Sequence, residues 1–474
     1  MSGEPKIHVG SRKSELALVQ TRHVIALLKQ LHPDKDFEIV TMSTLGDKIL
    51  DIPLPKIGEK SLFTQELEIA LASKRVDFVV HSLKDLPTTL PDGMAIGAVL
   101  SREDPRDALV LQKGLKNYSL ATLPENSVIG TSSLRRTAQL AKKYSHLKVE
   151  NIRGNLNTRL KKLDDLGTYQ AIILASAGLI RIGWKNRISK MLDSEEFLYA
   201  VGQGALAVEC RENDENIIKL LEPLYDLQTA LRIIAERSFL KTLGGGCSAP
   251  VAVTSNLILI KEKEVELSLK GAVWSLDGKE EVLDNAKTQL NVLDSIKCAE
   301  CPYKNGFIEI IDIECCISCP VSPNKMPPAK KTRLNITKEL LENDPHEKCP
   351  MQLPIGLDFM GQCPYLEGDL QTIHNHLPLD GSPAEIKKIA QECPYLKQTT
   401  ERLNNIVSAP SVSIENNNSN LFVGLVSHKS ITKENLKKAQ ILGENLARNL
   451  IQKGALDIMS KAQAIVHGGT KVKT

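Results

Sequence analysis

Gly130-Thr131-Ser132-Ser133-Leu134-Arg135-Arg136 carries the clearest indication of fold class in this chain of 474 residues. It follows Ser127–Ile129, a short apolar run that predicts a buried strand. The small polar residues after that run are typical of the start of a helix, and the arginines appear as the helix begins. A strand that leads through such a turn into a helix is the repeating unit of layered α/β folds with mostly parallel sheets.

The same order of strand, small polar turn and arginine recurs elsewhere in residues 1–225. It occurs at Gly10–Ser14, at Ile152–Arg159 and, more loosely, at Ala175–Arg181. Apolar periodicity also predicts a helix over Ser14–Leu31. We therefore expect α/β layers over this part of the chain. Further strands are predicted at Ile7–Val9, Phe37–Met42, Phe78–Val80 and Ala171–Leu174.

These strand-to-helix junctions are suited to binding anions. Helix N-termini offer unpaired N–H groups and the positive end of the helix dipole, and arginine adds a fork that matches carboxylate or phosphate. One such junction alone would be a helix cap with a solvated arginine. Several junctions at the C-terminal ends of strands, where open α/β sheets bind ligands, predict a polyanionic substrate. The sequence leaves carboxylate and phosphate open, although it lacks a Walker-type phosphate loop.

Charged residues also follow directly after the predicted apolar strand Phe78–Val80. Asp85 lies at the end of this strand with Lys84 beside it, and Pro87 ends the segment. A carboxylate placed there could stabilise a cationic intermediate or move a proton, or it could be an ordinary turn aspartate. His81 is interpreted as structural. The segment Leu45–Phe63 is predicted to form a mobile lid over a cleft.

A glycine-rich turn follows a second amphipathic helix, predicted over Leu231–Leu243. The turn reads Gly244-Gly245-Gly246-Cys247-Ser248-Ala249-Pro250, and glycine is the residue expected just past a helix C-terminus. Cys247 is therefore expected on an open loop, where a thiol is available for covalent chemistry. The alternative is a half-buried cysteine beside a glycine turn.

A third region is predicted to combine strands and helices. Residues Thr288–Leu293 and Leu421–Val426 are expected to be neighbours in one sheet, so that a short loop could rejoin them if the sequence between them were deleted. The other predicted elements are strands at Val251–Val253 and Glu264–Ala272, a helix over Lys433–Leu450 and a second helical stretch after Lys453-Gly454.

Composition is ordinary for a soluble protein, with 42% hydrophobic residues, 25% charged residues and a net charge of +3. It gives no reason to expect nucleic-acid or membrane binding. The N-terminal residues have no apolar core typical of a secretory signal, and the longest apolar stretches, such as Ala171–Ile180, are too short to span a bilayer. We therefore expect a cytoplasmic protein with reduced cysteines.

Residues 295–419 differ in kind, because they hold eight of the ten cysteines and many prolines. They are predicted to form a long surface insertion that is partly disordered. Three interpretations stay open: a zinc site, haem bound through Cys-Pro thiolates, or thiols that bind nothing. The spacing that favours zinc is that of Cys298, Cys301, Cys316 and Cys319.

Taken together, these motifs resemble the hydroxymethylbilane synthases, also called porphobilinogen deaminases. The resemblance covers residues 6 to about 290 and 421 to about 465. It implies two periplasmic-binding-protein-like α/β lobes with a cleft between them, and a small α+β C-terminal domain with a long Cys/Pro-rich insertion. The implied boundaries are 1–102 plus 202–225 for lobe 1, 103–201 for lobe 2, 226–294 plus 420–474 for the third domain, and 295–419 for the insertion. The most specific motifs are His81–Pro87, Gly130–Arg136, Ile152–Arg159, Val201–Ala205 and Gly245–Ser248.

The resemblance also implies roles for individual residues. Cys247 matches the attachment site of a covalent dipyrromethane cofactor, and Asp85 matches the catalytic aspartate. Arginines at the junctions match residues that hold the acetate and propionate groups of the cofactor and of the growing chain. The residues matched to cofactor binding are Lys84, Arg12, Ser14, Arg135, Arg136 and Arg159, and those matched to substrate binding are Arg12, Ser14, Arg153, Arg181 and Gln203.

The activity implied is the condensation of four porphobilinogen molecules onto the dipyrromethane primer, followed by hydrolytic release of the linear tetrapyrrole in haem synthesis. Loss of ammonia from porphobilinogen would give a cationic azafulvene, which Asp85 can stabilise. No metal is expected in the active site, and a monomer is expected. Two alternatives remain at this stage: a non-catalytic two-lobed protein that binds small anions, and an inactive homologue.

Overall fold

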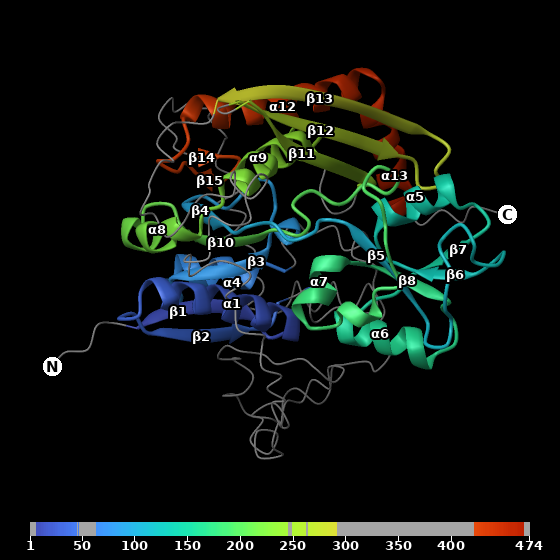
Figure 1. Cartoon of the computed structure of the whole chain (residues 1–474), viewed down its shortest axis with the longest axis horizontal. Coiled ribbons are helices and arrows are strands. Elements are labelled where there is room, and N and C mark those ends of the chain that lie inside the picture. The colour runs from blue at the N-terminus through green and yellow to red at the C-terminus, as the bar shows by residue number, and fades with distance from the viewer. Residues whose placement is uncertain are drawn as a thin grey trace, which may run out of the picture. The chain divides into compact units, whose positions relative to one another are not determined.

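The computed structural model describes residues 6–44, 46, 63–244, 249–261, 264–291 and 421–468, all within one of the two compact units of the chain (Figure 1). In this part of the chain, no helix combines the length and the apolar character that a bilayer crossing requires. The predicted mixture of strands and helices is confirmed.

The first lobe is built on a seven-stranded sheet in the order β14-β15-β4-β10-β3-β1-β2. Strand β1 pairs in parallel with β2 and β3, whereas β10 lies antiparallel between β3 and β4. The core of this lobe includes Val9, Phe78, Val80 and Val208. Its elements are β1 (Ile7–Arg12), α1 (Glu15–Leu31), β2 (Phe37–Met42), α4 (Gln65–Ala72), β3 (Phe78–Ser82), β4 (Met94–Val99), β10 (Leu206–Arg211) and α8 (Glu215–Leu221).

Helix α1 shows how local sequence produces this lobe. The hydroxyl of Ser14 accepts a hydrogen bond from the Ala17 amide at 3.4 Å, and Glu15 lies in the first turn, where a negative charge favours the helix dipole. Val24 and Leu28 are fully buried one turn apart. The helix predicted over Ser14–Leu31 is thus confirmed, with Ser14 as its cap.

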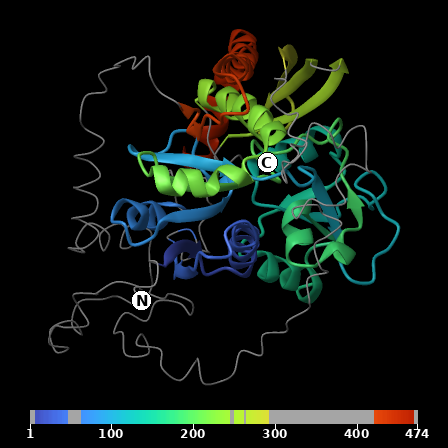
Figure 2. The same ribbon diagram turned by 60° about the vertical axis from the view of Figure 1, so that its left-hand side comes forward.

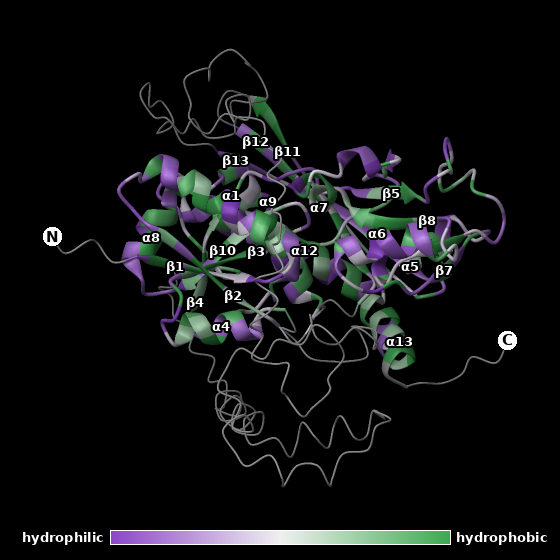
Figure 3. Cartoon of the chain, turned by 90° about the horizontal axis from the view of Figure 1, so that it is seen from below, coloured by the Kyte–Doolittle hydropathy of each residue, from purple (hydrophilic) through white to green (hydrophobic). Residues whose placement is uncertain are grey.

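The second lobe is built on a five-stranded sheet in the order β7-β6-β8-β5-β9. Strand β6 pairs in parallel with β7 and β8, so all three strands end at the same edge of the sheet. Helices α5, α6 and α7 begin after these ends, which confirms the strand-to-helix junctions. Strand β8 is hydrophobic, whereas the helices beside it carry hydrophilic residues (Figure 3). The elements are β5 (Asp107–Leu111), β6 (Val128–Gly130), α5 (Leu134–Lys143), β7 (Lys148–Glu150), α6 (Leu156–Asp165), β8 (Ala171–Ala175), α7 (Ser176–Arg181) and β9 (Lys190–Met191).

A third region packs two long helices against an antiparallel three-stranded sheet (Figures 1 and 2). Helix α12 approaches α9 closely at Gly443, where a Cβ atom would lie 2.0 Å from the carbonyl oxygen of Ala235. Glycine at this position is therefore required by the helix packing. The elements are α9 (Leu227–Thr242), β11 (Val251–Lys261), β12 (Glu264–Trp274), β13 (Glu281–Asn291), α12 (Lys433–Gln452) and α13 (Ala455–Gly468).

One expectation about this region is wrong. Residues 421–426 form a hairpin of two short strands, β14 (Leu421–Phe422) and β15 (Leu425–Val426), and β15 pairs with β4 in the sheet of the first lobe. The carbonyl oxygen of Gly424 accepts a hydrogen bond from the Ile96 amide at 2.7 Å. Thr288 lies in β13, in a different sheet, so the two segments are not sheet neighbours. Two-residue strands have no alternation from which a partner could be predicted.

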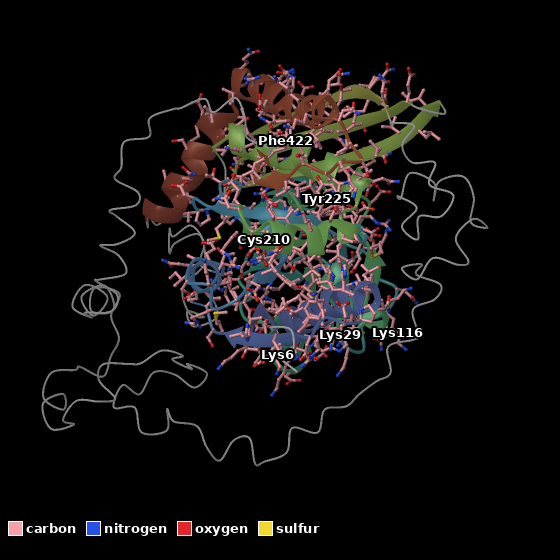
Figure 4. The ribbon with its side chains drawn as sticks, turned by 90° about the vertical axis from the view of Figure 1, so that its left-hand side faces the viewer. Lys6, Lys29, Lys116, Cys210, Tyr225 and Phe422 are labelled. Atoms are coloured by element: carbon pink, nitrogen blue, oxygen red, sulfur yellow. The ribbon has the colours of Figure 1, made fainter. Side chains whose placement is uncertain are left out.

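Several side chains of the first lobe and of the segments packed on it are buried. Cys210 on β10 is fully buried, and Tyr225 and Phe422 are nearly so, whereas Lys6 is exposed (Figure 4). Burial raises the pKa of the Cys210 thiol to about 12, so this cysteine is a packing residue and not a nucleophile.

Candidate active site

A pocket of about 350 Å³ is lined by residues of both lobes. Six cationic side chains and the carboxylate of Asp85 reach it, and most of them come from the strand-to-helix junctions. The structure therefore brings together most of the predicted site residues. Those that line the pocket are Arg12, Ser14, Lys84, Asp85, Arg136, Arg153, Arg159 and Arg181.

Asp85 ends a short 3₁₀ turn, Leu83–Asp85, that directly follows β3. The turn is held at its start by the Leu83 amide, which donates to the carbonyl oxygen of Ala205 at 3.0 Å. Inside the turn, the Leu86 amide donates to the Leu83 carbonyl at 3.1 Å. The carboxylate of Asp85 is thus presented by a hydrogen-bonded turn at the end of a buried strand.

Lys84 lies next to Asp85 and also faces the pocket. Burial lowers the pKa of its ammonium group to about 8, although the charge of Asp85 acts in the opposite direction. Its Nζ atom donates to Oε1 of Gln203 at 3.5 Å. Lys84 is therefore mostly cationic at neutral pH and is suited to pair with a carboxylate ligand.

Asp107, a buried carboxylate that sequence reasoning missed, is hydrogen-bonded to the lining residue Arg136 and to two of its neighbours. Asp107, at the start of β5, is fully buried and accepts hydrogen bonds from Arg135 at 2.8 Å, from Arg136 at 2.7 Å and from Gln203 at 2.9 Å. Burial opposes ionisation of Asp107, but the two guanidinium groups outweigh it and hold the pKa of the carboxyl well below its usual range.

Two predicted site residues, Arg135 and Gln203, are absent from the pocket lining of the described structure. Arg135 also donates to the carbonyl oxygen of Leu198 at 2.7 Å, and Gln203 donates to that of Pro105 at 2.7 Å. The guanidinium of Arg135 and the amide nitrogen of Gln203 are therefore bound to Asp107 and to nearby backbone, while the amide oxygen of Gln203 accepts from Lys84. They support the residues of the lining and do not form part of it.

Arg159 is a lining residue with an unusual environment. Burial, together with the charges of Arg136 and Arg153, lowers the pKa of its guanidinium to about 10. Its Nε atom donates to the carbonyl oxygen of Gly154 at 2.7 Å, which fixes the side chain at the start of α6. Mutually repelling guanidinium groups of this kind favour a bound ligand with several negative charges.

The two lobes also meet through polar contacts at the pocket. Asn157 in the first turn of α6 donates a hydrogen bond to the carboxylate of Glu15 in the first turn of α1. Arg181 on α7 donates across to the carbonyl oxygen of Gly204 at 2.7 Å, and within its own lobe it donates to Glu103 at 2.8 Å. Sequence reasoning missed the Glu15–Asn157 contact, because 142 positions separate its partners.

His81, which was interpreted as structural, is buried and lies 2.9 Å from the carboxylate of Glu209. The interpretation is confirmed, because the ring takes part in a buried pair on two adjacent strands.

Several predicted features lie outside the described residues. They include Cys247, the four cysteines Cys298, Cys301, Cys316 and Cys319, and most of the proposed lid, of which Gly46 and Phe63 are described and line the pocket. Helix α9 ends at Thr242, and Gly244 has a φ of +67°, a conformation that favours glycine. The glycine predicted just past the helix is thus confirmed.

The composition of the pocket fits a ligand with several carboxylates. A dipyrromethane built from two porphobilinogen units carries four of them, and the lining supplies guanidinium and ammonium groups for each. Two carboxylates line the pocket, and because that of Glu15 accepts a hydrogen bond from Asn157, that of Asp85 is better suited to a positive centre on such a ligand.

Comparison with known proteins agrees with this chemistry. Residues 7–219 match the family model for the dipyrromethane cofactor binding domain of porphobilinogen deaminase, and residues 230–304 match its C-terminal domain. A porphobilinogen deaminase of Synechococcus elongatus is 53% identical over 273 residues, which cover 58% of this chain and 83% of the relative. The proteins of the same name from Gloeobacter violaceus and Nostoc are 54% and 48% identical, over 57% and 66% of this chain and 81% and 95% of their own lengths.

Proposed function

Because the chain belongs to the porphobilinogen deaminase family, we propose that the pocket between its lobes is the site of tetrapyrrole assembly. The protein is a hydroxymethylbilane synthase, a transferase that condenses four porphobilinogen molecules head to tail and releases the linear product by hydrolysis. The alternative of a non-catalytic anion-binding protein finds no support among these relatives. The observation that carries the proposal is the convergence of six cationic side chains and Asp85 on one pocket.

The cofactor of the family is a dipyrromethane, which when bound supplies the pyrrole carbon that reacts with the first substrate molecule. We propose Cys247 as its attachment point, on the basis of its place in the motif Gly245–Ser248. We assign the carboxylates of the bound chain to Arg12, Arg136, Arg153 and Arg159, together with Ser14, Lys84 and Arg181. Arginine suits this task because its planar fork binds a carboxylate through two hydrogen bonds.

Asp85 is proposed to act on the substrate. Loss of ammonia from porphobilinogen leaves a cationic pyrrole, and a preorganised carboxylate beside the pyrrole N–H lowers the energy of that charge. The hydrogen-bonded turn keeps Asp85 in place without reorganisation during the reaction. Lys84, with its pKa of about 8, keeps a positive charge next to Asp85 at neutral pH.

Three further proposals rest on the sequence. We propose a cytoplasmic location and a monomeric state, and we keep zinc, haem and no ligand as the alternatives for residues 295–419, which lie outside the described residues.

Mass spectrometry of the purified full-length protein tests the proposed function. We expect the wild-type chain to carry a mass increment of two linked pyrroles on Cys247 and to consume porphobilinogen. The C247S variant is expected to fold, to lack the increment and to lose most of its activity. An unmodified wild-type chain, or a C247S variant that turns over at the wild-type rate, would contradict the proposal.

A further inference from the structure

Arg237 is a buried arginine that plays no part in the pocket described above. It lies on α9 with 2% of its surface exposed. Its guanidinium donates to three backbone carbonyl oxygens: that of Val423 at 3.1 Å, that of Leu86 at 3.3 Å and that of Pro87 at 2.7 Å. Burial lowers the pKa of Arg237 to about 10, so the side chain remains charged at neutral pH.

These three carbonyl groups belong to segments of separate origin. Leu86 and Pro87 directly follow Asp85, at the exit from its turn. Val423 lies between β14 and β15, in the hairpin that completes the sheet of the first lobe. Arg237 itself lies about one and a half turns before the end of α9, the helix that leads to the Cys247 loop. One side chain thus joins the catalytic turn to the helix that precedes the proposed cofactor site.

The Asp85 turn is consequently fixed on both sides. Before Asp85, the Leu83 amide donates to the carbonyl oxygen of Ala205. After Asp85, the two carbonyl groups of Leu86 and Pro87 are held by Arg237. If this second anchor were absent, the turn could pivot about the first, and the carboxylate would move relative to α9.

The chemistry of Arg237 argues for a role beyond packing. Removing a guanidinium from water is unfavourable, and apolar residues of similar volume often fill such a site with equal or greater stability. Arginine differs from them in presenting several N–H donors in a rigid plane, which can hold several acceptors in one fixed arrangement. Its use here therefore fits a site where relative position matters.

We propose that Arg237 is a positioning residue for catalysis: it sets the place of Asp85 relative to the helix that leads to the cofactor-bearing cysteine. This inference rests on the proposed function. A displacement of about 1 Å at a catalytic group is enough to slow a reaction by large factors, so loss of this anchor should lower kcat more than it raises KM.

The test compares R237K with wild type, both as the full chain. Lysine keeps the charge and the aliphatic stem but cannot hold three acceptors in one plane. We expect kcat to fall about tenfold or more, with KM for porphobilinogen within about twofold and the pyrrole increment on Cys247 retained. R232K is the matched control, because Arg232 lies on the same helix and donates to Ser255 at 3.0 Å. It should leave kcat within about twofold of wild type.

A double-mutant cycle with D85N distinguishes an effect of Arg237 on the position of Asp85 from a general disturbance of the structure. If Arg237 acts through Asp85, R237K should lower kcat by less than about twofold in the D85N background, because the carboxylate it positions is already lost. A tenfold loss in both backgrounds, a kcat for R237K equal to wild type, or an R237K protein that does not fold would each overturn the proposal. The proposed function is tested separately, because it requires that the wild-type protein consume porphobilinogen, whereas the role of Arg237 is tested by the kcat of each variant relative to wild type.

Discussion

Arg136 and Asp107 are joined by a 2.7 Å hydrogen bond from Nη2 to Oδ1, directly beneath the pocket. A second nitrogen of this guanidinium, Nη1, donates to the carbonyl oxygen of Ile173 at 2.9 Å. Asp107 therefore sets the direction in which Arg136 presents itself to a ligand. Asp107 does not line the pocket, yet it fixes the orientation of Arg136, which does.

Asp107→Asn should lower both affinity and stability. The amide removes the charge that pairs with Arg135 and Arg136, so two buried guanidinium groups lose their counterion. We expect a loss of about 3 kcal/mol in the free energy of unfolding and a KM for porphobilinogen raised by about tenfold. Denaturant titration and steady-state kinetics measure these effects. D164N is the control, since Asp164 pairs with Arg187 at 2.8 Å in the same lobe without lining the pocket.

Asp85→Asn keeps the shape of the side chain and removes its charge. We expect kcat to fall about 100-fold or more, which is typical for the loss of a preorganised electrostatic group, with the melting temperature nearly unchanged. Single-turnover measurements of ammonia release would locate the loss at the chemical step. A change in kcat of less than about threefold would show that Asp85 is an ordinary turn residue.

Arg159 and Arg135 should respond differently to substitution by alanine, although both arise from the same sequence pattern. Arg159 lines the pocket, so R159A should raise KM and alter the distribution of chain-elongation intermediates on native gels. Arg135 is bound to Asp107 and to Leu198, so R135A should lower the free energy of unfolding by about 3 kcal/mol. Equal effects of both variants on KM and on stability would contradict this division.

Glu68 should make stability depend on pH. Burial, with a further contribution from Glu209, raises its pKa from 4.5 to about 7, while His81 and Thr64 act in the opposite direction. The native state therefore binds a proton that the unfolded chain releases above pH 4.5, and this stabilisation is lost as the pH rises through about 7.

E68Q mimics the protonated form, so it should exceed wild type in stability by about 1–3 kcal/mol at pH 8 and show little advantage at pH 4. Urea titration at the two pH values measures the difference. E38Q, at an exposed position, should show no comparable gain. A wild-type-like pH dependence in E68Q would argue against the perturbed pKa.

Residues 295–419 should be dispensable for turnover, because every residue assigned to chemistry lies outside them. The join must, however, connect two different sheets, since Asn291 ends β13 and Leu421 begins β14. A Gly/Ser linker of about 15 residues, with a mean span of about 20 Å, should keep kcat within a few-fold. A two-residue turn should prevent folding. An inactive but folded long-linker variant would show that the insertion contributes to catalysis.

Short sequence motifs predicted the site residues that lie at the ends of strands or at the starts of helices. Arg12 ends β1, Lys84 and Asp85 lie in the turn that follows β3, and the arginines of α5 and α6 follow a cap, so each position is set by its neighbours in sequence. Asp107, Glu15 and Arg237 were missed, because their partners lie 28 to 186 positions away and no short motif surrounds them. Strands β4 and β10 were missed as well, since Gly97 interrupts the apolar run of β4 and Glu209 interrupts that of β10, and neither strand shows a regular alternation.

The place of β10 in its sheet has a consequence for how the protein is made. This strand lies between β3 and β4, yet it is synthesised after the whole second lobe, and the β14–β15 hairpin emerges later still. After β4 has been synthesised, more than 100 further residues must be added before β10 is available to pair with β3 and β4. The first lobe thus leaves the ribosome with an open sheet edge beside which the second lobe folds, and it is completed only after the whole second lobe has been synthesised.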